Sequence, residues 1–119
     1  MKNQKNNYRL NVSKAQKALV KFMKNFIYCT DKTKEAYLYD ILNFLSFMQQ
    51  EQENPRGYLY INEYYLMEWI HSIAPRISVS RLTQILQVIN HFLQAITDEG
   101  LISVNPLSEF KARYRKPKI

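Results

Sequence analysis

A polar face without a single acidic residue runs along residues 80–94. Apolar residues recur every three to four positions from Ser80 to Asp98, which predicts an amphipathic helix. Its other side carries amides and hydroxyls: Ser80, Thr83, Gln84, Gln87, Asn90, His91 and Gln94, with Arg81 at the boundary. Solvated helix faces are usually built from Glu and Lys, whereas amides and hydroxyls can pair with base edges in the major groove. This face therefore favours nucleic-acid contact, although Gln is also a good helix former that can simply face water.

Four lysines form a basic stripe on an expected first helix, which should run from Ser13, as N-cap, to Ile27. They recur at intervals of three and four residues and are Lys14, Lys17, Lys21 and Lys24. A stripe of one charge on one helix face can follow a phosphate backbone. A membrane-surface helix has a similar composition and is the minority interpretation.

The formal charge of +7 is distributed unevenly along the 119 residues. Residues 1–30 hold seven bases and no acid, and residues 31–110 hold five bases and all ten acids. The last nine residues add five bases, among them Lys111, Arg113, Arg115 and Lys116. Basic ends around a mildly acidic middle indicate flanks that neutralise phosphates, while the alternative is that both ends are solvated tails.

Several classes of function are excluded by what the chain lacks. Its two glycines, Gly57 and Gly100, can build neither a P-loop nor a dinucleotide-binding fingerprint. A single cysteine, Cys29, and two distant histidines do not make a metal site, so we expect no metal and no cofactor. We expect a cytoplasmic protein, since neither a secretory signal nor an apolar run long enough to span a bilayer is present.

The remaining segments predict further helices. A second helix is expected over residues 30–52, with a polar side formed by Glu35, Tyr39, Asn43, Ser46 and Gln50. Residues 53–61 contain Asn, Pro and Gly and predict a loop. Asn62 should cap a third helix that ends near Pro75. The expected fold class is all-α: a compact bundle of four main helices plus a short C-terminal helix of at most one turn.

Two motifs in this order resemble a known family. Thr33, Tyr37, Asp40, Ile41, Phe44 and Phe47 match the pattern T-x-x-x-Y-x-x-D-L-x-x-F-x-x-F, and Gly100, Ile102, Asn105 and Pro106 match G-x-I-x-x-N-P. Both patterns are typical of the N-terminal core-binding domain, also called SAM-like, of phage integrases and other tyrosine site-specific recombinases. The resemblance divides the chain into a basic N-terminal arm (1–12), a core-binding helical domain (13–110) and the start of a basic interdomain linker (111–119).

The resemblance implies one half of a clamp that closes around duplex DNA at a recombination core site. The second and fourth helices would then lie against the major groove. The positions carried over to this sequence are Lys32, Thr33, Tyr39 and Asn43 on the second helix, and Ser80, Arg81, Thr83, Gln84, Gln87, Asn90 and His91 on the fourth. Tyr37 and Asp40 are expected to serve packing and helix geometry instead.

No catalysis is expected from this chain. The family's chemistry belongs to a separate C-terminal domain, which supplies two arginines and a tyrosine nucleophile. This chain contains no H-x-x-R, and Tyr114 lies in the expected linker. The parent protein would break and rejoin DNA together with further recombinase protomers, while the isolated domain would be monomeric.

Two other interpretations stay open. A helical protein-interaction domain would dock its partner on exposed aromatics, namely Tyr58, Tyr60, Tyr64 and Tyr65. Salt separates this interpretation from DNA binding, because phosphate contacts weaken as counterions are released and an apolar interface is nearly indifferent. A free-standing helix-turn-helix regulator ranks last, since no convincing short turn joins two helices of the right length.

Overall fold

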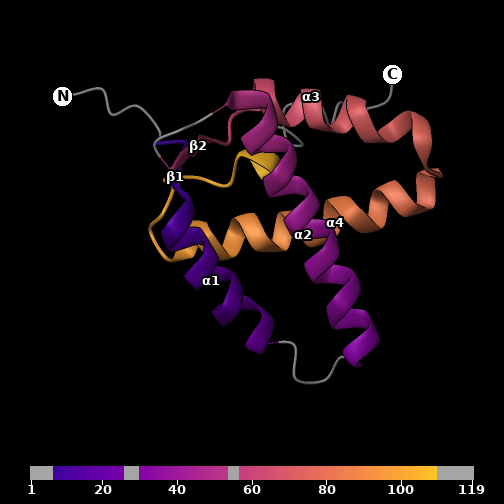
Figure 1. The fold of residues 1–119 in the computed structure, drawn as a ribbon, viewed down its shortest axis with the longest axis horizontal. Coiled ribbons are helices and arrows are strands. Elements are labelled where there is room, and N and C mark those ends of the chain that lie inside the picture. Colours follow the sequence, from indigo (N-terminus) through magenta and orange to yellow (C-terminus); the bar gives the residue numbers. More distant parts are fainter. Residues whose placement is uncertain (1–6, 26–29, 54–56, 110–119) are drawn as a thin grey trace, which may run out of the picture.

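Helices make up most of the protein, and the expected all-α fold class is confirmed (Figure 1). The structure is a computed structural model that describes residues 7–25, 30–53 and 57–109. In chain order its elements are β1 (Arg9–Asn11), α1 (Val12–Lys24), α2 (Asp31–Gln52), β2 (Tyr58–Tyr60), α3 (Glu63–Ile73), the 3-10 turn η1 (Ala74–Arg76) and α4 (Val79–Asp98).

A side-chain cap begins each long helix by accepting a hydrogen bond from a backbone N–H of the first turn; the caps are Asn11, Thr30, Asn62 and Ser78. The predicted starts of α2 and α3 are confirmed. The predicted cap of α1 is wrong, because Asn11 rather than Ser13 accepts from the N–H of Lys14. Asn11 ends a strand, so its backbone already has the extended conformation that an N-cap requires.

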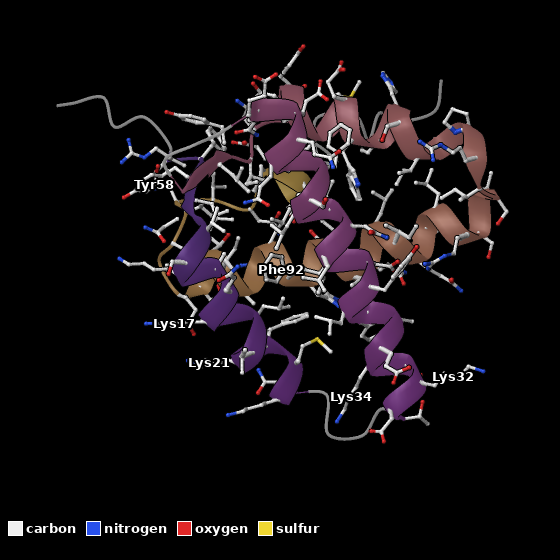
Figure 2. All side chains as sticks on the ribbon, in the orientation of Figure 1. Lys17, Lys21, Lys32, Lys34, Tyr58 and Phe92 are labelled. Carbon is white, nitrogen blue, oxygen red and sulfur yellow. The ribbon has the colours of Figure 1, made fainter. Side chains whose placement is uncertain are left out.

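The core forms where α4 crosses α2 (Figure 1). Phe44 of α2 and Phe92 of α4 are both fully buried. Each extends the core to a further helix through an edge-to-face ring contact: Phe92 meets Phe22 of α1 at 5.8 Å between centroids, and Phe44 meets Trp69 of α3 at 4.8 Å. Figure 2 shows Phe92 near the centre of the molecule. The crossing of α2 and α4 is therefore the frame on which α1 and α3 pack.

A small β-ribbon joins segments that were expected to be an arm and a loop. β1 pairs antiparallel with β2, with Leu10 opposite Leu59, and both leucines are buried in the core. The N–H of Asn7 also donates to the hydroxyl of Ser103 at 2.6 Å. Residues 7–12 thus belong to the folded domain, which begins before residue 13. Pairing between strands of three residues, about 50 positions apart, leaves too short an alternation to see in the sequence.

Beyond α4 the chain turns back against the helix. Gly100 has a φ of +81°, which suits glycine at a helix end, and residues 106–109 form one helical turn, as expected. Asn105 is buried and caps this turn by accepting from the N–H groups of Leu107 and Ser108. Residues 1–6 and 110–119, including the expected linker with Lys111, Arg113, Arg115 and Lys116, lie outside the described residues.

Replacing Leu10 by alanine tests whether residues 7–12 belong to the fold. Leu10 is fully buried, so we expect Leu10→Ala to lower the free energy of unfolding by about 2–5 kcal/mol. The matched control is Leu42→Ala on α2, where the side chain is 49% exposed and the expected loss is below about 1 kcal/mol. Urea unfolding followed by circular dichroism measures both. Equal stability of Leu10→Ala and wild type would show that β1 is not part of the core.

Candidate nucleic-acid interface

A cleft of about 590 Å³ lies between the first part of α2 and residues 81–91 of α4. The α2 side of its lining is Thr30, Lys32, Thr33, Ala36, Tyr37 and Asp40, and the α4 side is Arg81, Gln84, Gln87, Val88 and His91. Six of the residues expected to contact DNA therefore line one cavity: Lys32, Thr33, Arg81, Gln84, Gln87 and His91.

Packing of the apolar faces explains this convergence. Ile41 and Phe44 of α2 and Ile89 and Phe92 of α4 are fully buried, so the polar sides of both helices turn outward. Because the helices cross, the outward side of α4 flanks the start of α2, with the apolar Val88 in the floor between them. The polar strip of α4 thereby meets the start of α2 in one cleft, whereas the polar side expected on α2 (Glu35, Tyr39, Asn43, Ser46 and Gln50) does not line this cleft.

An ion pair between the buried Asp40 and the partly exposed Arg81 joins the two helices at the edge of the cleft. The Asp40 side chain is 3% exposed, and its two oxygens accept from Arg81, Oδ1 from Nη2 at 2.6 Å and Oδ2 from Nη1 at 3.2 Å. A carboxylate buried this deeply requires a charged, doubly hydrogen-bonded partner. Arg81 was expected to contact DNA; in the structure its guanidinium donates two hydrogen bonds to Asp40.

The same ion pair borders a second hollow of about 260 Å³. This hollow contains Tyr39 and Asn43 of α2, the other two residues expected to face DNA, opposite Arg76 and an apolar floor of Trp69, Ile73, Ile77 and Ile85. Tyr39 is 62% exposed. Asp40 and Arg81 line both cavities, so the α2 residues predicted from the resemblance lie along one surface on either side of the pair.

Asn90 does not face this surface, contrary to its expected role. Its side-chain oxygen accepts from Nδ2 of Asn105 at 2.9 Å and from the hydroxyl of Ser108 at 3.2 Å. The amide is therefore used to hold the returning C-terminal segment against α4. Ser80 and Thr83 are exposed near the start of α4 but line neither cavity, and the Thr83 hydroxyl donates to the carbonyl of Val79.

The lysine stripe of α1 forms a separate feature. Lys14, Lys17 and Lys21 line a shallow hollow of about 240 Å³ together with Glu99 and Leu101, beyond the far end of α4. The exposed Lys21 pairs with Glu99 at 2.7 Å, which takes one cation out of the stripe at little gain in stability. Lys24 is exposed at the end of α1. Figure 2 shows Lys17 to the left of α1 and Lys32 to the right of α2, so stripe and cleft are different sites.

Hydrogen bonding rather than charge dominates the cleft. The described residues contain all ten acids but only nine of the seventeen bases, so the positive excess belongs to sequence outside them. Lys32 is the one lysine in the lining, and the charge of Arg81 is balanced by Asp40. Glu35 is exposed on α2 nearby. A ligand of this cleft would be recognised mainly through hydrogen bonds with amides, hydroxyls and an imidazole, and electrostatic attraction by the cleft residues would contribute little.

The expected aromatic patch is divided in the structure. Tyr60 and Tyr64 are 48% and 63% exposed, whereas Tyr65 is partly buried against the core. The ring of Tyr58 lies under the guanidinium of Arg9, 4.2 Å from ring centroid to Cζ. A hydrogen bond with Asn11, followed by a hydrogen bond and charge interaction with Arg9, lowers the pKa of Tyr58. Tyr58 and Tyr65 are thus engaged within the protein, and the exposed ring of Tyr64 meets Tyr65 edge-to-face at 5.1 Å between centroids.

Comparison of the chain with protein-family models, curated proteins and solved structures found no match. Across the described ranges, no helix is long and apolar enough to cross a membrane, and no three His, Cys, Asp or Glu side chains cluster in a way that could hold a metal ion. The resemblance to recombinase core-binding domains therefore rests on its two sequence motifs.

The ion pair makes a stability prediction. Arg81→Met leaves the buried Asp40 carboxylate without its partner and should lower the free energy of unfolding by about 1–3 kcal/mol. Arg76→Met is the matched control, since Arg76 is exposed beside the same hollow and its loss should change stability by less than about 0.5 kcal/mol. Chemical denaturation at neutral pH compares the two. Similar small effects would mean that the pair does not contribute to the α2–α4 contact.

Proposed function

We propose that this chain is the DNA-binding domain of a tyrosine site-specific recombinase of the phage or mobile-element integrase type. In this proposal the domain binds duplex DNA with the surface formed by α2 and α4. The observation that supports it is the convergence of the polar side of α4 with the start of α2 in one cleft, where Gln84, Gln87 and His91 face Lys32 and Thr33.

The cleft residues have the chemistry that this role requires. An α-helix fits into the major groove, and Gln84 and Gln87 carry amides that can form paired hydrogen bonds with adenine. Lys32 in the cleft carries a charge that can neutralise a phosphate, and Thr33 and Tyr39 carry hydroxyls that can donate to the sugar-phosphate backbone. The remaining charge would come from the lysine stripe and from the basic sequence at both ends of the chain.

The proposed role is binding, with no catalytic step by this chain. On DNA the domain would act beside further recombinase protomers and a catalytic domain, in the cytoplasm, as part of a bacterial or phage-encoded protein. Off DNA it would be monomeric. A competing candidate, a protein-interaction domain, draws on the exposed side chains of Tyr60 and Tyr64.

A titration of the isotopically labelled protein with a generic DNA duplex, followed by NMR, tests the proposal. Backbone amide shifts should cluster at residues 31–33 and 81–91, and they should fade between about 50 and 200 mM salt because phosphate binding releases counterions. Shifts confined to the chain ends, or shifts around Tyr60 and Tyr64 that are indifferent to salt, would contradict a DNA interface on α2 and α4.

A pair of lysine variants separates a local phosphate contact from an effect of net charge. Lys32 lines the cleft and Lys34 does not, and Figure 2 shows the two pointing to different sides of α2. Lys32→Ala should weaken duplex binding several-fold at low salt and reduce the slope of log K against log salt by about 0.9, the value for one phosphate contact. Lys34→Ala removes the same charge and should have a clearly smaller effect in fluorescence anisotropy. Equal effects would mean that the cleft holds no specific phosphate.

A further inference from the structure

Arg81 occupies a special place on the proposed interface. Its side chain is 37% exposed and lines both hollows, while the carboxylate that holds it is almost fully buried. More than a third of the Arg81 side chain is therefore accessible at the surface between the two hollows, while one edge of its guanidinium meets Asp40. An arginine on an exposed helix face samples many rotamers, but this one is held by two hydrogen bonds.

The pair with Asp40 leaves a second donor fork. A guanidinium has five N–H groups, and Asp40 takes one from Nη1 and one from Nη2. Three N–H groups remain, and those of Nε and Nη2 are parallel and lie on one edge of the plane. That edge can form two parallel hydrogen bonds with an acceptor pair of matching spacing, such as two phosphate oxygens or the O6 and N7 of guanine.

The charge of Asp40 decides between these two acceptors. A phosphate at the free fork would lie a few ångströms from the Asp40 carboxylate, and two like charges at that distance repel each other. The O6 and N7 atoms of guanine carry no formal charge, so they gain the two hydrogen bonds without that repulsion. An arginine neutralised by a buried carboxylate is thus better suited to reading a base than to binding the backbone.

We infer that Arg81, held in place by Asp40, reads a guanine in the major groove through its Nε and Nη2 N–H groups. This inference rests on the proposed DNA-binding function and names the residue that determines part of its sequence preference. Asp40 is the positioning residue, because it acts on DNA only through Arg81. Lys32 has the complementary role: its phosphate contact supplies affinity without sequence information.

Selection of binding sites from a random-sequence duplex library provides the probe. Wild-type protein should enrich sites with one invariant G·C pair. Replacing that guanine by deazaguanine, in which a carbon takes the place of N7, removes one of the two acceptors and should weaken wild-type binding by about 5- to 100-fold. This measurement uses the unaltered protein, so it does not depend on whether any variant folds. Enriched sites without an invariant guanine, or unchanged affinity for deazaguanine, would overturn the inference.

Two variants assign the guanine to Arg81. Arg81→Lys keeps the charge but loses the rigid planar fork, so it should show a clearly smaller deazaguanine penalty than the wild type and should keep the wild-type salt slope. Asp40→Asn removes the anchor and should reduce the guanine preference while Arg81 is still present. The assignment would be overturned if Arg81→Lys kept the full deazaguanine penalty. It would also be overturned if Arg81→Lys lowered the salt slope by about 0.9, as the loss of a phosphate contact does.

The Lys32→Ala variant distinguishes failure of this inference from failure of the proposed function. If the protein binds DNA through the cleft, Lys32→Ala weakens all duplexes alike and leaves the enriched site unchanged. If Lys32→Ala behaves in this way but the Arg81 variants keep the full guanine preference, only the base contact is refuted. No salt-dependent duplex binding by the wild type refutes the proposed function and the inference with it.

Discussion

The contact between α2 and α4 determines the rest of the structure, and its polar element is the ion pair between Asp40 and Arg81. The apolar residues of the two helices, among them the fully buried Phe44 and Phe92, set the crossing only loosely, because many hydrophobic pairs pack comparably well. The Asp40 carboxylate is 3% exposed and accepts two hydrogen bonds from Arg81, at 2.6 and 3.2 Å. This pair would be broken by a small shift of α2 along α4, whereas apolar contacts tolerate such a shift. The hollows on both sides of the pair follow from this register.

The other elements pack against the crossed helices α2 and α4 and cover their buried side chains. α1 covers Phe92 through Phe22, α3 covers Phe44 through Trp69, and the β-ribbon closes the core with Leu10 and Leu59. Asn105 and its partners on α4 hold the returning chain in place. The cleft is thus built on the rigid crossing of two long helices, which is where a recognition surface can be most precise.

Under the proposed function, different parts of the molecule would supply affinity for DNA and discrimination among sequences. The cleft itself holds few free charges, and the described residues together are close to electrically balanced. Lysine and arginine are concentrated near the chain ends and on α1. Long-range attraction and affinity would come from those segments, and discrimination among sequences from the amides, the imidazole and the anchored arginine of the cleft.

The sequence by itself determined the helices and their faces, since caps such as Thr30 and Asn62 and apolar repeats are local signals of about 11 to 18 residues. It also singled out the polar residues of α4 that line the cleft, while Lys32 and Thr33 were expected only from the resemblance. Only the tertiary structure decided that Asn90 faces inward to Asn105, that Arg81 belongs first to Asp40, and that the lysine stripe lies apart from the cleft. The residue type states what a side chain can bond, but which partner it meets depends on segments distant in sequence, and no local pattern contains that information.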